Sequence, residues 1–371
     1  MRLLARTSIL LGTVLVLLYF ASMGPVYNWD MIGYVAAAYH KDGYRGQELL
    51  DKTYSDIRNE VGADVYADLV GGRNPHYRQT VAADPVALEQ QLPFYSIRIV
   101  YVELMRGLKR LGMEYPASTY RISIVFSVLC VFALGLLCIQ QRVPLMAVPF
   151  VVLAAGYVDL VALSLPDAMA CFFALLATWA VLDGRKLAYL LAALLPLVRT
   201  DYFILSCFLM GYCFWKGNRI ASVITVVAVL AVYGVTNAAH AHYGWLTLFN
   251  FTFMEFSPYP AELRLSTNPM DYIKPYIAAT TTFLTHAHMP FYFLALFLLA
   301  RRGKIKIVSI EASHLLLLLI PLLFLAVHLA LFPLLQERFF VYSSSLVLIW
   351  IMKQLDPGIT QCDPRSSPAC G

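Results

Sequence analysis

Charged residues lie at four places in this sequence where an apolar segment begins or ends. The four groups are Asp30, Asp159 with Asp167, Arg199 with Asp201, and Glu337 with Arg338. A carboxylate at the rim of a cavity can act as a general base for a hydroxyl group. An arginine can bind a phosphate through paired hydrogen bonds and neutralise the charge of a departing phosphate. Acids and bases at a bilayer edge would therefore suit a lipid-phosphate substrate.

Each of these residues taken alone has a simpler explanation. A single charge at a helix end is more often an anchor, and Arg199 could form a structural ion pair with Asp201 or Asp167. Charges near the bilayer interior are nevertheless costly, and they usually face a cavity and have a partner. Four such groups on one predicted face, with nothing comparable on the other, favour a site.

The composition of the chain indicates a protein whose solvent is lipid. Of its 371 residues, 60% are apolar and only 14% are charged, and the mean hydropathy is +0.66. Soluble domains carry roughly 25% charged residues. The net charge of +5 does not indicate nucleic-acid binding, because most lysines and arginines outside residues 25–120 form short clusters between apolar runs. No cysteine lies in residues 25–120, which excludes a disulfide framework there.

The apolar runs predict an all-α polytopic membrane protein with about ten transmembrane helices. Residues 1–24 are expected to hold the first helix, although a basic start and apolar core also fit a signal peptide. An extracytoplasmic loop of roughly 95 residues (25–120) follows, far longer than a usual connection. The remaining bundle covers 121–353, with a second outer loop at 240–276 and a cytoplasmic, disordered tail at 354–371. The further expected spans are 122–139, 144–164, 167–182, 221–239, 277–300, 314–332 and 340–352.

The segment 187–215 is predicted to be a hairpin of two short helices. Leu187–Val198 and Tyr202–Trp215 are both apolar, and Arg199-Thr200-Asp201 separates them. A single long helix would place an arginine and an aspartate near the bilayer centre. Basic residues flank both outer ends, so the positive-inside rule places both ends in the cytoplasm. Each arm is only roughly 18–21 Å long, so the tip is expected to lie below the far surface.

This membrane topology places both chain termini in the cytoplasm and the two polar segments on the outer face. For a bacterial inner membrane that face is periplasmic or extracellular. The spacing of Tyr95, Ile99, Val102, Met105 and Leu108 also predicts an amphipathic helix on the membrane surface. A solvated helix face fits this spacing equally well.

Two His-x-His pairs, His240 with His242 and His286 with His288, suggest a metal. Residues two apart on a helix point to different sides, however, so this spacing favours interfacial histidines over a metal site.

Several short motifs, in their order along the whole chain, resemble the GT-C class of polytopic glycosyltransferases. Asn28-Trp29-Asp30 is similar to the acidic motif that these enzymes carry after the first span. The stretch from Ser164 to Ala174, which contains Asp167, looks like the start of their fourth helix. The segment Asp183–Asp201 resembles their short hairpin with an Arg-x-Asp tip, and Glu337-Arg338-Phe339-Phe340 resembles the opening of a late helix. Pro93–Arg98 is similar to a stretch in bacterial relatives.

The resemblance implies transfer of a sugar from a polyprenyl-phosphate carrier to an envelope acceptor by an inverting displacement. Asp30 would deprotonate the acceptor. Arg338 and Arg199 would hold the donor phosphate, with Arg98 as a weaker candidate. Asp167, Asp201, Glu337 and Asp159 would support them. The chain departs from larger members in having fewer spans and no soluble C-terminal domain. A single displacement requires no cofactor or metal, although the sequence leaves a divalent ion open.

Two other functions also fit the sequence. A lipid-linked-sugar flippase or other transporter would also need charged groups in a membrane cavity, but would have less use for the long polar loop. In a non-catalytic subunit of an envelope-assembly machine, that loop would be a docking surface. The expected partners are the lipid-linked donor, a lipid or glycan acceptor and the bilayer, with no nucleic acid.

Overall fold

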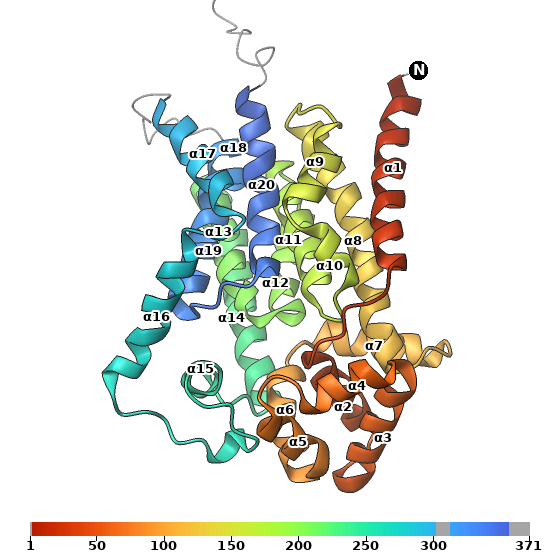
Figure 1. The fold of residues 1–371 in the computed structure, drawn as a ribbon. Helices are drawn as coiled ribbons and strands as arrows, with labels where there is room; N and C mark the ends of the chain where they lie inside the picture. The colour runs from red at the N-terminus through yellow and green to blue at the C-terminus, as the bar shows by residue number, and fades with distance from the viewer. Residues whose placement is uncertain (1, 302–311, 356–371) are drawn as a thin grey trace, which may run out of the picture.

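The computed structural model of the chain is built from helices (Figure 1). It describes residues 2–301 and 312–355. Within these ranges no strand forms, and the only β-bridge joins Val26 to Leu163. The all-α prediction is therefore confirmed for the described chain.

Long apolar helices run side by side through the upper part of the molecule in Figure 1. Three are long and apolar enough to cross a membrane: α8 (Tyr115–Gln140), α14 (Arg219–Ala239) and the continuous stretch Ala312–Leu331. That stretch comprises α18 (Ala312–His314), a π-helical turn (Leu315–Leu319) and α19 (Ile320–Leu331). Shorter apolar helices pack beside them: α1 (Arg2–Ser22), α11 (Asp167–Leu182), α12 (Leu187–Val198) and α17 (Met289–Arg301).

The outer surface of α14 is also apolar. Ile220, Ile224, Val227 and Val235 are all exposed on it, and an apolar face of this size is unusual for a protein in water. These features indicate a membrane protein. The count of ten crossing helices stays a prediction.

Six helices between α1 and α8 gather at one end of the bundle. They are α2 (Asp30–Lys41), α3 (Gly46–Glu60), α4 (Ala63–Gly71), α5 (Pro75–Ala83), α6 (Pro85–Tyr95) and α7 (Ile99–Arg110). The start of α1 and the end of α20 (Glu337–Leu355) lie at the opposite end (Figure 1). This arrangement agrees with a topology in which both ends of the described chain lie on one side and residues 25–120 lie on the other.

The helix expected at 95–111 is shorter, and its apolar face covers protein. Tyr95 ends α6, and α7 begins at Ile99. Val102 and Met105 are fully buried, because α7 packs against α2 and α8. These two residues of the predicted apolar face are therefore covered by protein and not by lipid.

Two of the expected spans are broken in the structure. The segment 144–164 forms two short helices, α9 (Ala147–Ala154) and α10 (Tyr157–Ala162). They are separated at Gly156, whose φ of +84° is incompatible with a continuing right-handed helix. The segment 277–300 divides into α16 (Pro269–Phe283) and α17. Pro290 lacks an amide hydrogen and its ring crowds the carbonyl four residues earlier, which favours a helix that begins beside it, as α17 does at Met289.

The predicted hairpin is present. α12 ends at Val198, the backbone is extended at Arg199, and α13 (Phe203–Trp215) follows a single 3-10 turn at Thr200–Tyr202. α12 and α13 pack against each other and against α14. Arg199 is 8% exposed, so the hairpin tip is buried among other helices, as the short arms predict.

Gly33 in α2 permits a close approach that a side chain would prevent. A Cβ at this position would lie 2.3 Å from Cδ2 of Tyr95, and that ring is confined between Tyr34 and Trp29. We expect Gly33→Ala to destabilise the protein by about 1–3 kcal/mol through overpacking. Thermal unfolding of the purified protein in detergent measures this.

Gly107→Ala is the matched control, because a Cβ on Gly107 meets no atom within 4 Å. This change within α7 should stabilise by about 0.5–1 kcal/mol through helix propensity. A melting temperature for Gly33→Ala at or above that of the wild type would contradict the packing argument.

Candidate functional site

Asp30 is positioned by a short segment that runs beside the loop between α10 and α11. The Val26 amide donates to the Ala162 carbonyl at 2.8 Å, and the Ser164 amide donates to the Val26 carbonyl at 3.3 Å. The Ser164 hydroxyl also accepts from the Asn28 amide. These bonds bring the start of α2 next to the start of α11, and with it Asp30 next to Asp167.

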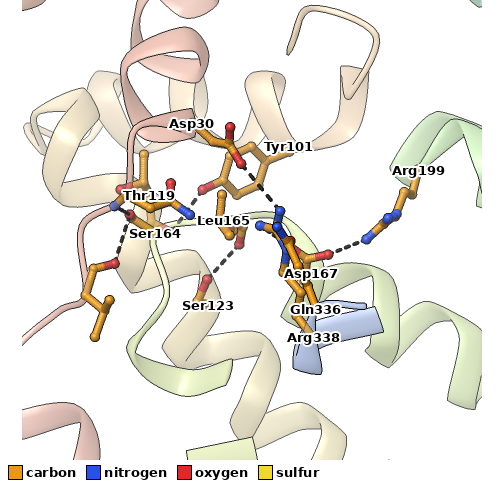
Figure 2. Close-up of polar contacts among 12 residues, drawn as sticks. Asp30, Tyr101, Thr119, Ser123, Ser164, Leu165, Asp167, Arg199, Gln336 and Arg338 are labelled. Carbon is orange, nitrogen blue, oxygen red and sulfur yellow. Dashed lines mark hydrogen bonds and ion pairs between the residues drawn. The ribbon is translucent and has the colours of Figure 1, made fainter. Parts of the chain in front are cut away.

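Asp167 lies between two arginines from distant parts of the chain (Figure 2). Its Oδ1 forms an ion pair with Arg199 Nη1, and its Oδ2 lies 3.3 Å from Arg338 Nη1. The other terminal nitrogen of Arg338, Nη2, is 3.5 Å from Asp30 Oδ2. Asp167 is only 5% exposed. One buried carboxylate from the second predicted charged group therefore contacts the third group through Arg199 and the fourth through Arg338, and Arg338 links it to Asp30 in the first.

The hairpin tip extends this chain of charges. Arg199 Nε donates to Asp201 Oδ1 at 2.8 Å, and Asp201 Oδ2 lies 3.3 Å from His328 Nδ1 on α19. The guanidinium of Arg199 also stacks over the Phe339 ring at 4.7 Å. Cation–π contact and two carboxylates together satisfy a cation that is almost completely removed from water.

All five predicted acids share one structural feature, a place in the first turn of a helix. The five are Asp30 in α2, Asp159 in α10, Asp167 in α11, Asp201 in the 3-10 turn and Glu337 in α20. Free backbone amides and the helix dipole stabilise negative charge at this end of a helix. Helix starts that converge on one place can therefore hold carboxylates at a depth that would otherwise disfavour them.

A single cavity of about 1140 Å³ contains all eight predicted site residues in its lining. These are Asp30, Arg98, Asp159, Asp167, Arg199, Asp201, Glu337 and Arg338. Arg73 and Arg78 also line it, which brings the charged lining to five arginines and five carboxylates. When all of these arginines and carboxylates are ionised, their charges sum to zero.

Arg98 differs from Arg199 and Arg338 in having no counter-ion. It forms no ion pair with any residue that the structure describes, and its Nη1 is buried without a hydrogen-bond partner. Arg199 and Arg338 are already paired with carboxylates. The resemblance ranked Arg98 below both, whereas the geometry makes it the best prepared of the three predicted arginines to bind an anion.

Other polar atoms in the cavity lining also lack partners. Asn28 Oδ1, Trp29 Nε1 and His328 Nε2 are buried and accept or donate no hydrogen bond within the described chain. Buried polar groups are nearly always satisfied by protein, water or ligand. Unpaired donors and acceptors that border one cavity are typical of a site that receives a polar ligand.

Several lining residues were not identified from the sequence. The Tyr95 hydroxyl donates to Asp30 Oδ1 at 3.1 Å, and burial together with Asp30 raises the pKa of Tyr95 well above its usual value. Burial and the nearby Arg98 lower the pKa of His242 to about 4, so its imidazole is neutral near pH 7. The sequence marked Tyr95 only as part of an apolar helix face and His242 only as half of a His-x-His pair, and neither pattern assigned the residue to this site.

Glu337 lies on the cavity wall but does not pair with an arginine. Its carboxylate contacts the two histidines of one His-x-His pair, His288 at 2.9 Å and His286 at 3.5 Å. Asp159 is exposed and forms no ion pair with the described residues. Asp30, Asp167 and Asp201 thus form one chain of ion pairs through Arg338, Arg199 and His328. Arg98, Asp159 and Glu337 line the same cavity outside that chain.

Comparison with known proteins adds no family assignment. No family model, no curated protein and no solved structure matches this chain.

Asp167 should be the residue whose removal costs most stability. Asp167→Asn removes the counter-ion that the buried Arg199 shares with the partly buried Arg338, and we expect a loss of about 3–5 kcal/mol. The double variant Asp167→Asn/Arg199→Gln should lose less than the sum of the two single changes, by about 0.5–3 kcal/mol. The free energies of unfolding of the wild type, the two single variants and the double variant, measured in one detergent, complete this double-mutant cycle.

Asp271→Asn is the control, because Asp271 pairs with Lys274 on the exposed surface of α16. Surface pairs contribute at most about 1 kcal/mol. Additive losses in the cycle, or equal losses for Asp167→Asn and Asp271→Asn, would show that the buried network is not coupled.

Proposed function

We propose that this protein is a membrane-embedded glycosyltransferase that takes a sugar from a polyprenyl-phosphate carrier. The observation that carries the proposal is the placement of Asp30 beside Arg338 in a cavity that also contains the unpaired Arg98. A carboxylate next to arginines provides a base and an anion site within one space. Resemblance to the GT-C class supplies the reaction class, and its transfer to this chain is an analogy.

The cavity lining suits a ligand that is apolar at one end and anionic at the other. Leu248, Phe253, Leu331 and Phe332 line it together with the arginines. Apolar side chains of this kind can pack against a lipid chain, while the guanidinium groups bind the phosphate. Arg98 is the first candidate for the phosphate, because its donors are not already used.

In the proposed reaction Asp30 takes the proton of the acceptor hydroxyl. The hydroxyl oxygen forms a bond to the anomeric carbon as the bond from that carbon to the phosphate oxygen breaks. The bonding electrons leave with the polyprenyl phosphate, whose negative charge is stabilised by Arg98 and Arg338. Asp30 is 36% exposed at its side chain, so an acceptor in the cavity can reach it. A single displacement of this kind inverts the anomeric configuration.

Asp30→Asn tests the role of the base. The change keeps the shape of the side chain and its capacity to accept from Tyr95, but removes proton affinity. We expect transfer to fall by about 10²-fold or more. The measurement is deletion of the gene in its host, profiling of surface glycans and of lipid-linked sugars, and complementation with wild type or variant at equal membrane abundance.

Asp51→Asn serves as the matched control, because Asp51 is an exposed carboxylate of α3 whose only described contact is with Gln47. It should restore the wild-type glycans. Full restoration by Asp30→Asn would reject the catalytic proposal. An Asp30→Asn variant that no longer moves lipid-linked sugar across the membrane, but transfers sugar normally in membrane fragments, would favour a flippase.

The proposed orientation makes a separate prediction. Ser55 lies on an exposed face of α3, and residues 25–120 contain no native cysteine. A membrane-impermeant maleimide should label Ser55→Cys in intact cells after removal of any outer barrier. Cys362 and Cys370 in the tail should react only after permeabilisation.

The wild-type protein, treated in parallel, reports labelling of the native cysteines alone. Labelling of Ser55→Cys that requires permeabilisation would place the six-helix end in the cytoplasm. That result would reject the predicted location of the site.

A further inference from the structure

His286 and His288 do not lie within a helix, although the argument from their spacing assumed that they do. α16 ends at Phe283 and α17 begins at Met289, so both histidines belong to the turn between them. Their rings lie side by side, with centroids 5.4 Å apart and planes at 27°. Residues two apart point to different sides only when they lie on a helix, so that argument against a shared metal ion does not apply here.

Glu337 completes a group of three possible metal ligands. His288 Nε2 is 2.9 Å from Glu337 Oε2, and His286 Nε2 is 3.5 Å from Glu337 Oε1. The ligand atoms of all three residues lie within 4.8 Å of one another. Tetrahedral zinc with bonds of about 2.0–2.1 Å has ligand atoms about 3.3 Å apart. Small adjustments of the side chains would thus bring the three around one ion.

The surroundings of this group orient one histidine so that its Nε2 faces Glu337. His288 Nδ1 lies 2.8 Å from the Ser344 hydroxyl, which leaves Nε2 directed at Glu337. The Tyr292 hydroxyl contacts both Ser343 and Ser344. Hydrogen bonds to the other ring nitrogen orient a histidine ligand and are a usual part of metal sites.

His286 supplies the independent sign that a ligand is missing. Its side chain is only 7% exposed, its ring packs on Phe340 at 4.1 Å, and its Nε2 is buried without a hydrogen-bond partner. The His288 amide lies 3.5 Å from His286 Nδ1. Ligation through Nε2 would put the proton on Nδ1 and release that long contact, at little cost.

The charges near Glu337 leave its carboxylate available. Arg338 follows it in the chain, but its guanidinium is directed at Asp30, Asp167 and Gln336. Among the residues that the structure describes, the partners of Glu337 are the two histidines. Its side chain is 53% exposed and it lines the cavity, so a further ligand can approach from that side.

We propose that His286, His288 and Glu337 bind one divalent transition-metal ion at the wall of the cavity. Two imidazoles and one carboxylate suit zinc and its neighbours in the first row, whereas magnesium and calcium prefer oxygen ligands alone. Three protein ligands leave at least one coordination position for water or for an anionic group in the cavity. The proposal does not depend on the glycosyltransferase reaction.

The test measures metal on the full-length protein purified in detergent with an affinity tag that contains no histidine. After treatment with a chelator and titration with zinc or cobalt, elemental analysis should give one ion per chain. Magnesium in excess should not displace it. Bound cobalt should also give visible absorption bands that report its coordination.

His288→Gln and Glu337→Gln should each weaken zinc binding by at least about 10-fold. Ser344→Ala keeps the three ligands and removes the orienting hydroxyl, and about a 10- to 100-fold loss is expected. The other His-x-His pair provides the matched control, since His240→Gln/His242→Gln leaves all three ligands in place and should bind zinc as the wild type does.

Failure of the wild type to retain zinc or cobalt would overturn the proposal. Unchanged affinity in monodisperse His288→Gln and Glu337→Gln proteins would also overturn it. Ser344→Ala distinguishes loss of a site from loss of the fold, because it should change affinity and cobalt absorption while the protein stays monodisperse.

Discussion

The buried carboxylate of Asp167 is the interaction on which the site depends. It is the shared counter-ion of Arg199 and Arg338, which come from the hairpin tip and from the start of α20. Each arginine has one further carboxylate partner, Asp201 for Arg199 and Asp30 for Arg338, but only Asp167 joins the two, and loss of one partner of a buried ion pair is costly. Arg338 in turn pairs with Asp30. The position of Asp30, and therefore any chemistry that it performs, follows from the position of Asp167.

The six-helix end supports this network from the other side. Hydrogen bonds between Val26 and residues 162–164 fix the segment that leads into α2, and the Tyr95 hydroxyl holds one oxygen of Asp30. Gly33 allows the Tyr95 ring to approach α2 closely enough for that bond. Asp30 therefore has one oxygen held by the six-helix end and the other by the bundle, and residues of both parts line the cavity.

The sequence predicted the helix ends at which charges lie, because each is marked by an apolar run that begins or ends there. It also predicted the break at Arg199, since an arginine and an aspartate within three residues oppose a single long span. It could not predict which arginine lacks a counter-ion, because pairing is decided by side chains that are distant in the sequence, as Arg98 shows. For His286 and His288 only the assumption of a continuous helix was wrong. Pro290 stands four residues after His286 and disfavours a continuous helix there, but the argument from the spacing took no account of it.

The pairing of Asp30 with Arg338 has a consequence for the proposed reaction. Arg338 Nη2 lies 3.5 Å from Asp30 Oδ2, so that oxygen is not free to approach an acceptor hydroxyl. A phosphate in the cavity would compete for Arg338 as well as for Arg98, because guanidinium groups bind phosphate through paired hydrogen bonds. A move of Arg338 toward the phosphate would release Asp30 Oδ2 to the acceptor. Binding of the donor would thus open access to the base, and the same arginine would be in place for the negative charge that develops on the leaving group.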